Sequence, residues 1–160
     1  MRSAARKDLV SFALPGICVL CAAMAICGWD TVRRGGSLYT LSPQRVVGLS
    51  LLLGGLAAML TAQVTLWRFY SSTLVIRDGH RLITHGIYRF ARHPIYLGAI
   101  VGLIGVPVYV SSLYGLLAML GLVPVFLRRI GMEEAMLCEE FGDAHQAYCE
   151  STRRLIPFIY

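Results

Sequence analysis

The sequence predicts an all-α integral membrane protein with about four transmembrane helices and one further helix outside the membrane. Two features of composition predict this class: apolar residues make up 56% of the 160-residue chain and charged residues only 15%. The mean hydropathy of +0.63 agrees. Such values are typical of membrane proteins rather than soluble domains. We expect a single membrane domain over 1–160, with two spans in 1–68 and the remaining elements in 69–160.

The first two spans are predicted from uninterrupted apolar runs. Leu9–Gly28 has 20 residues, and Val46–Trp67 has 22 residues without a charge. Both lengths suit a helix that crosses a hydrocarbon core of about 30 Å. The basic N-terminus and the "AMA" at 23–25 resemble a signal peptide, but the length of the first run favours a retained helix.

A third apolar run, Ile95–Leu127, has 33 residues without a charge and is too long for one span. As a single helix it would measure about 50 Å. We therefore expect a hairpin of two helices with its break within 107–115. Residues that weaken a helix or suit a membrane interface gather there, namely Pro107, Tyr109, Ser111, Ser112, Tyr114 and Gly115.

The distribution of basic residues predicts the orientation. Twelve of the fifteen Lys and Arg residues lie in the N-terminal segment, in 68–94 and in the tail after 127. The positive-inside rule then predicts an N-in, C-in arrangement, with Arg33, Arg34 and Arg45 outside. The polar segments 68–94 and 128–160 would meet in the cytoplasm. Lipid headgroups and topology explain the net charge of +6 better than nucleic acid does.

The five cysteines predict no metal site. Cys18 and Cys21 have two-residue spacing but no matching second pair, and they lie in an apolar run. We interpret them as small membrane hydrophobes.

The stretch "RFARHPIYLG", residues 89–98, concentrates polar side chains where a span begins. These are Arg89, Arg92, His93 and Tyr96, with Tyr88 just before. Pro94 suits the first turn of a helix, whose N-terminus carries partial positive charge and free N–H groups. One interpretation is an anion site roofed by Tyr88 and Tyr96. The alternative is that the arginines only touch lipid phosphates and His93 only caps its helix.

Gly98 and Gly102 follow in the same run, four residues apart. Small residues at this spacing let another backbone or a flat ligand come close.

The tail predicts one helix over 131–150. Leu137, Phe141, Ala144 and Tyr148 form an apolar stripe, while Glu139, Asp143 and Glu150 fall on the opposite, solvated face. Glu133 and Glu134 flank the stripe, so at least one should point inward toward the basic loop. The alternative is that they only favour the helix start, where negative charge is stabilising.

Three pieces in this order resemble the isoprenylcysteine carboxyl methyltransferase family and its bacterial relatives, which include phospholipid N-methyltransferases. They are "LITHGIYRFARHPIYLG", "EEAMLCEEFGDAHQAY" and "TRRLIP". The pattern is T-x-G-x-Y, R-H-P-x-Y-x-G, a hairpin, E-E-x-x-L, F-G, Y and I-P. The resemblance covers 82–157, about half of the chain. His145 stands where the family often has a tyrosine.

The resemblance implies S-adenosylmethionine as methyl donor and a lipophilic acceptor that arrives from the bilayer. Its cofactor site would consist of Gly86, Tyr88, Arg92, His93, Tyr96, Leu97, Gly98, Glu133 and Glu134. An anionic acceptor would be held by Arg89 or Arg129, whereas an amine acceptor would need a base such as Glu133. A bacterial-type cytoplasmic membrane, with the site facing the cytoplasm, is the implied location.

Two other function classes stay open at this point. The end "YCESTRRLIPFIY" also resembles membrane sterol reductases, which use NADPH, although those are far longer and carry Asp-Glu where this chain has Glu-Glu. A non-enzymatic membrane module that binds anionic lipid is the other alternative. It leaves an inward Glu133 or Glu134 unexplained.

Overall fold

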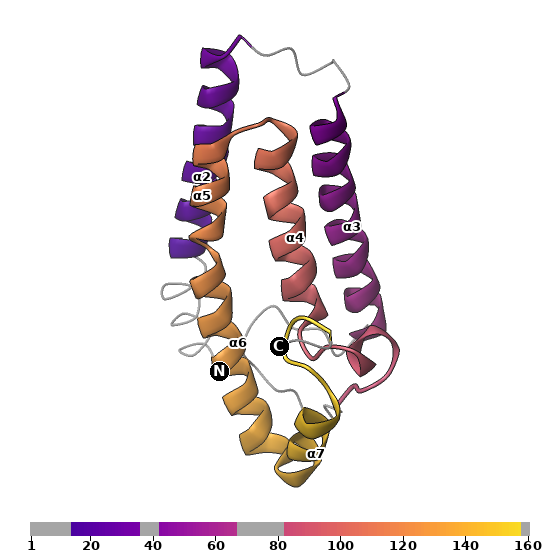
Figure 1. Ribbon diagram of the computed structural model, residues 1–160. Helices are drawn as coiled ribbons and strands as arrows, with labels where there is room; N and C mark the ends of the chain where they lie inside the picture. The colour runs from indigo at the N-terminus through magenta and orange to yellow at the C-terminus, as the bar shows by residue number, and fades with distance from the viewer. Residues whose placement is uncertain (1–13, 36–41, 67–81, 158–160) are drawn as a thin grey trace.

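The computed structural model describes residues 14–35, 42–66 and 82–157, and these ranges fold as helices joined by short turns. The elements are α2 (Leu14–Arg33), α3 (Pro43–Leu66), the 3-10 helix η3 (Gly86–Arg89), α4 (Pro94–Tyr109), α5 (Leu113–Leu120), α6 (Val123–Phe141) and α7 (Asp143–Ser151). Figure 1 shows α2 and α4 running one way and α3 and α5–α6 the other. The all-α prediction is confirmed.

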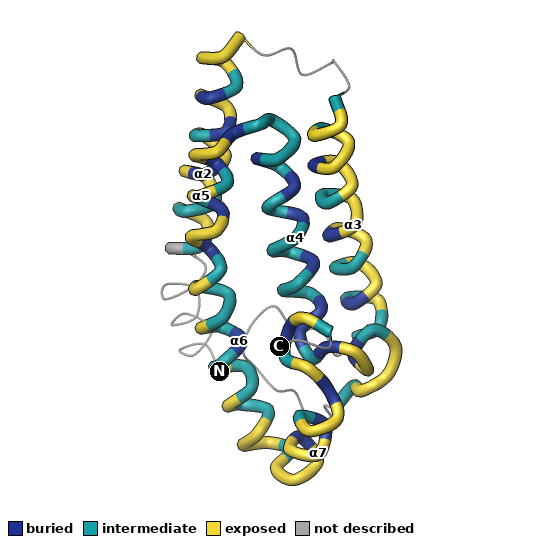
Figure 2. The backbone as a smooth tube through the Cα atoms, viewed as in Figure 1, coloured by how far each residue is buried: buried dark blue, intermediate teal, exposed yellow. Residues whose placement is uncertain are grey.

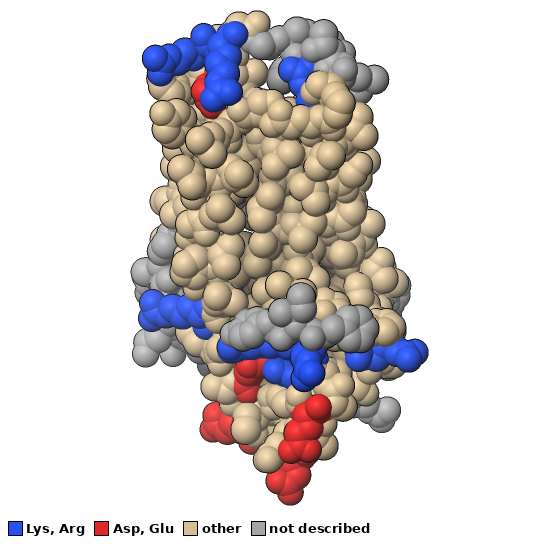
Figure 3. Space-filling model, viewed as in Figure 1, with Lys and Arg blue, Asp and Glu red and all other residues tan. Residues whose placement is uncertain are grey.

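Three stretches of the described residues are long and apolar enough to cross a membrane: Gly16–Arg33, Pro43–Leu66 and Leu113–Phe141. The shorter apolar helix α4 lies between them. Figure 3 shows a broad band without charged side chains, with arginines at its two ends. This is the arrangement of an integral membrane protein. The predicted starts and ends at Leu9 and Trp67 fall outside the described residues.

Helices α3 and α4 pack backbone against backbone. A Cβ placed on Gly98 would lie 2.6 Å from the Gly55 carbonyl oxygen, and one on Gly105 would lie 2.5 Å from the Leu52 nitrogen. The buried positions of the two helices face each other along this contact (Figure 2). Of the two predicted uses of Gly98, close approach of another backbone is the one observed.

The hairpin break lies within the predicted segment. Helix α4 ends at Tyr109 and α5 begins at Leu113. The turn is held by the Ser112 N–H, which donates to the Pro107 carbonyl at 2.9 Å, and by the Ser112 hydroxyl, which accepts from the Gly115 N–H at 3.0 Å. A serine at the N-cap is the expected way to satisfy such a free N–H.

The prediction of one tail helix over 131–150 is wrong. Helix α6 begins inside the apolar run at Val123 and continues to Phe141, where Gly142 (φ 49°) ends it and α7 starts a new direction. Glycine reaches positive φ without the Cβ penalty, so it breaks a helix that the apolar pattern alone would continue. The glutamates at 133 and 134 therefore sit on a helix that extends directly from the membrane.

The first helix joins the other half of the molecule. Ala23 on α2 packs with Met119 and Leu122 in a small buried cluster. At the end of α2, the Arg34 guanidinium donates twice to the buried Asp30 carboxylate, at 2.9 Å each, and once to the Ser111 carbonyl at 2.7 Å. This pair ties α2 to the turn between α4 and α5.

Candidate functional site

Three segments far apart in the sequence meet at the end of the molecule where α4 begins. They are the loop and helix start at 86–96, the α6 segment 129–134, and the stretch from α7 into the C-terminal residues, 145–154. Each polar contact of the two clusters described next joins two of these segments. The predicted meeting of the two polar segments at one end is thus confirmed.

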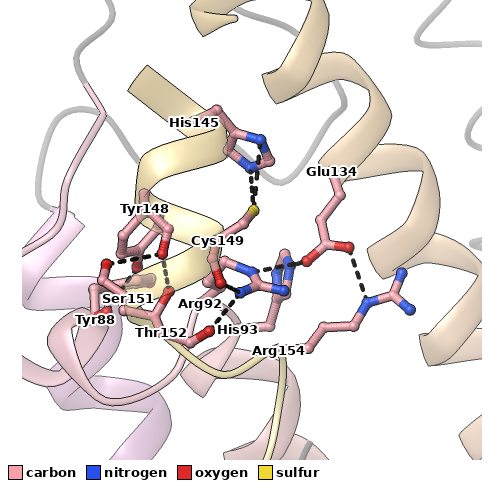
Figure 4. Close-up of polar contacts among 10 residues, drawn as sticks. All are labelled: Tyr88, Arg92, His93, Glu134, His145, Tyr148, Cys149, Ser151, Thr152 and Arg154. Carbon is pink, nitrogen blue, oxygen red and sulfur yellow. Dashed lines mark hydrogen bonds and ion pairs between the residues drawn. The ribbon is translucent and has the colours of Figure 1, made fainter. Parts of the chain in front are cut away.

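One carboxylate is the centre of the first cluster. Glu134 Oε1 accepts from Arg92 Nε at 3.0 Å and lies 3.2 Å from His93 Nε2, while its Oε2 lies 2.9 Å from Arg154 Nε (Figure 4). The His93 side chain is only 3% exposed and that of Glu134 is 18% exposed. Two guanidiniums face a single carboxylate, so the cluster keeps a net positive charge even with a neutral imidazole.

A second cluster is formed around Glu133, the residue before Glu134 on α6. The Tyr96 hydroxyl donates to Glu133 Oε2 at 2.8 Å and accepts from Arg129 Nε at 3.1 Å. The Tyr96 ring meets Phe126 edge to face at 6.0 Å and lies 5.8 Å from the His93 ring. Tyr96 therefore links the polar cluster to the apolar interior, with its hydroxyl held between a cation and an anion.

Tyr88 does not roof this site, contrary to the prediction. Its side chain is buried, and its hydroxyl approaches the Ala62 carbonyl of α3 at 3.5 Å. Its own carbonyl accepts from the Tyr148 hydroxyl at 2.7 Å. Burial raises the pKa of Tyr148 to about 12, so this phenol stays protonated and can donate. Tyr88 therefore packs between α3 and α7.

Gly86 is needed for the shape of the loop. Its φ of 63° is in the left-handed region, and a Cβ there would lie 3.0 Å from Thr65 Cγ2. Both the backbone conformation and the approach to α3 therefore favour glycine at this position.

Three other predicted residues lie outside the two clusters. Arg89 is exposed, with its guanidinium 4.9 Å from the centre of the Phe90 ring. Gly98 is used against α3, as described above. Leu97 is half-buried, and its N–H donates to the His93 carbonyl at 3.1 Å. Of the two arginines considered for an anionic acceptor, the structure brings Arg129 and not Arg89 beside Tyr96.

The residue missed by sequence reasoning is Arg154. Its guanidinium pairs with the Glu134 carboxylate at the centre of the first cluster. The signal was present in the "TRRLIP" motif, whose position after α7 brings it back to the loop at 91–93.

Beside the cluster lies a buried histidine. His145 is 4% exposed, and its ring nitrogens are 3.7 and 3.8 Å from Cys149 Sγ. Burial lowers the pKa of His145 and raises that of Cys149, so both are neutral near pH 7. Among the described residues no group of three metal-ligating side chains is found.

The charged side chains of the two clusters suit the carboxylate and ammonium groups of an amino acid. The cationic side of the first cluster suits a carboxylate, and Glu133 and Glu134 suit an ammonium or hydroxyl groups. The N-terminus of α4 adds partial positive charge, and the His93 side chain makes no capping hydrogen bond there. Tyr96 and Phe126 give the site an apolar wall.

Comparison with known proteins identifies the same family that the sequence motifs resemble. The "Probable protein-S-isoprenylcysteine O-methyltransferase" of Oryza sativa subsp. indica is 34% identical over 116 residues, 71% of this chain and 61% of that protein. The "Methanethiol S-methyltransferase 1" of Bradyrhizobium diazoefficiens is 37% identical over 78 residues, 49% of this chain and 27% of that protein.

A solved structure, that of the eukaryotic intramembrane Ras methyltransferase ICMT, matches with a TM-score of 0.77 and 25% identity. The match covers 89% of this chain and 52% of that one. The match thus spans 61% of the Oryza sativa protein, 52% of the solved chain and 27% of the Bradyrhizobium protein.

The family model of the isoprenylcysteine carboxyl methyltransferase (ICMT) family matches residues 46–139, which include most of α3, the 82–98 motif, the hairpin and both glutamates. With the motifs, the fold and the curated relatives in agreement, the chain belongs to the isoprenylcysteine carboxyl methyltransferase family.

Proposed function

We propose that the chain transfers a methyl group from S-adenosylmethionine to a lipophilic acceptor at the membrane surface. The observation that carries this proposal is the Glu134 cluster, in which Arg92, His93 and Arg154 surround one carboxylate at the start of α4. Family membership supports the methyl donor. It does not favour the reductase or the lipid-binding module.

In this proposal the two clusters have different tasks. His93 and Arg154 bind the carboxylate of the donor, and Glu134 binds its ammonium group. Tyr96 and Phe126 provide the apolar wall, and the bound donor supplies an electrophilic methyl group on a sulfonium. Such a displacement needs alignment and exclusion of water, and the buried or half-buried positions of these side chains suit both needs.

A carboxylate is the acceptor that the second cluster supports best. Glu133 already accepts a hydrogen bond from the Tyr96 hydroxyl, so it is engaged rather than poised as a base. A carboxylate needs no base, since it is ionised at neutral pH, and Arg129 beside Tyr96 can hold it. A prenylcysteine-like carboxylate is therefore our proposed acceptor, in agreement with the names of most relatives. The site would face the cytoplasm of a bacterial-type membrane.

The donor is tested first by titration of the detergent-purified protein with S-adenosylmethionine and, in parallel, NADPH. Selective binding of the first raises the melting temperature by mass action. A shift with NADPH alone would favour a reductase, and no shift with either would contradict the proposal.

The acceptor is tested with donor labelled in its methyl group. Four acceptors are compared: an S-prenylated cysteine, its methyl ester, a long-chain amine and methanethiol. The proposal predicts labelling of the free carboxylate and none of the ester. Labelling of the amine or the thiol instead would overturn the choice of acceptor while leaving the donor in place.

A further inference from the structure

The chain after α7 returns to the loop in front of α4 and pairs with it. The C-terminal strap, residues 152–157, forms a parallel bridge between Arg153 and Ala91. The Arg92 N–H donates to the Arg153 carbonyl at 2.8 Å, and the His93 N–H donates to the Arg154 carbonyl at 3.2 Å. A ladder of this length is marginal without further support.

The Arg92 side chain supplies that support. Its Nη1 donates to the Cys149 carbonyl at 3.0 Å and to the Thr152 carbonyl at 2.7 Å, while its Nε donates to Glu134. The last carbonyls of a helix have no partner within the helix, so a guanidinium there is a strong cap. These three hydrogen bonds use Nε and Nη1 of the Arg92 guanidinium, whose third nitrogen is Nη2.

We infer that Arg92 is a positioning residue, which fastens the C-terminal strap so that Arg154 stays against Glu134. The sequence assigned Arg92 to the cofactor, but its contacts join the loop, α7, the strap and α6. The consequence for binding rests on the proposed function, because Arg154 is there a ligand of the donor. The fastening itself does not depend on that function.

A second observation agrees with this assignment. Thr152 Oγ1 donates to the Tyr148 carbonyl at 2.5 Å, and Tyr148 donates to the Tyr88 carbonyl. The strap and α7 therefore form one unit against the loop (Figure 4). Arg92 joins this unit to Glu134 on α6, together with Arg154 of the strap itself.

The geometry also predicts that lysine cannot replace Arg92. Three acceptors on different segments match the planar fork of a guanidinium, whereas an ammonium is a point charge on a flexible stem. Arg92→Lys should thus behave nearly like Arg92→Gln. Arg153→Gln is the matched control, because Arg153 is an exposed strap arginine that takes part in the bridge through its backbone.

The first measurement reads the strap without any reaction. Cys149, at the end of α7 just before the strap, is half-buried, and Cys138 on α6 is exposed. Labelling with a charged maleimide, followed by mass spectrometry of the peptides, uses Cys149 as the reporter and Cys138 as the internal reference. We expect Cys149 to react at least about tenfold faster in both Arg92 variants than in wild type or Arg153→Gln. Equal rates in all four proteins would overturn the inference.

The second measurement separates positioning from direct contact. With Cys138 and Cys149 changed to Ser, Ala91→Cys and Arg153→Cys place a disulfide across the bridge, where neighbouring strands lie about 4.8 Å apart, within the span of a disulfide. In the Arg92→Gln background we expect the oxidised form to regain donor affinity and the reduced form to lose it, with kcat at saturating donor changed less than twofold.

If the cross-link forms and affinity is not regained, Arg92 contacts the donor directly and the inference is wrong. If wild type itself does not bind S-adenosylmethionine, the proposed function fails. The labelling rates then decide the fastening role alone.

Discussion

The molecule has two halves, α3 with α4 and α2 with α5 and α6, and the helices within each half pack in a different way. Helices α3 and α4 touch through glycines, with so little space that a Cβ on Gly98 would overlap Gly55. Helix α2 instead meets α5 and the residues after it through its side chains, in the small cluster of Ala23, Met119 and Leu122 and where Cys27 Sγ approaches Gly115. Backbone contact of this kind allows no adjustment, whereas a side-chain cluster can repack.

The candidate site draws on both halves. Helix α4, fixed against α3, contributes His93 and Tyr96, and α6, which continues α5, contributes Arg129, Glu133 and Glu134. Polar contacts join the halves at each end, through the Glu134 cluster at one end and through the bond from Arg34 to Ser111 at the other. The lesson is that one half can serve as a fixed frame while charge pairing sets the position of the other.

The largest effect is expected from Glu134→Gln, which removes the negative charge that the two halves share and leaves a single acceptor oxygen. Loss of one partner from a buried ion pair costs about 3–5 kcal/mol, and the partial exposure of Glu134 places it at the low end. Donor binding should be lost as well. Melting temperature and calorimetric titration measure the two effects.

Glu139→Gln is the control, because Glu139 is exposed on the same helix. It should stay within about 0.5 kcal/mol of wild type. An equal loss of protein stability in both variants would show that the Glu134 cluster does not hold the two halves together.

A smaller effect is expected from Gly98→Ala, which tests the fixed frame. The new Cβ would lie 2.6 Å from the Gly55 carbonyl oxygen and 2.9 Å from the Met59 nitrogen, so α3 and α4 must separate. Overpacking of this kind costs about 1–3 kcal/mol.

Gly102→Ala is its matched partner on the same helix face. There the nearest atom, the Leu52 carbonyl oxygen, is 3.6 Å away, an ordinary contact. We expect no loss of melting temperature. A loss as large as that of Gly98→Ala would mean that the close backbone contact does not hold the pair.

At the end of the molecule far from the candidate site, the pair of Asp30 and Arg34 tests whether protein stability can fall while donor affinity stays the same. Asp30→Asn keeps an acceptor for Arg34 but removes the charge, and Arg34 is half exposed, so we expect a loss of only about 1 kcal/mol. Affinity for the donor should not change. Arg33→Gln, which only removes a contact with Trp29, is the control. A fall in affinity without a fall in stability would contradict the division of tasks between the ends.

The smallest effect is a pH dependence from His145. Burial lowers its pKa in the folded protein, so the unfolded chain binds the proton more readily. The neutral ring therefore contributes its full stability above the unfolded pKa of about 6.5, and stability falls as the pH drops below that value. Melting curves from pH 8 to 5 should show a shallower decline for His145→Gln than for wild type. His85→Gln, at an exposed imidazole, should decline as wild type does.

Local properties of the sequence predicted much of the fold. Apolar length identified the spans, and the weak helix formers within 107–115 placed the hairpin turn. The inward glutamates also follow from a local pattern, since Glu133 and Glu134 flank the apolar stripe of α6 and both reach partners on the loop or strap side.

What the sequence could not predict depends on contacts between distant segments. Tyr88 turns away from the site because α3 and α7 offer it packing and a hydrogen-bond donor. Arg92 turns to the carbonyls of α7, whose position depends on the break at Gly142. A single helix drawn through Gly142 extends the apolar stripe of α6 into α7, where the chain has in fact changed direction. It therefore does not predict that Arg154 comes back to Glu134.

The central claim is that one site built from both halves binds S-adenosylmethionine through the Glu134 cluster. The most direct test is calorimetric titration of wild type, Glu134→Gln and Glu139→Gln in detergent. The account predicts saturable binding to wild type and Glu139→Gln and none to a folded Glu134→Gln. Equal affinity in all three, or no binding to wild type, would contradict it.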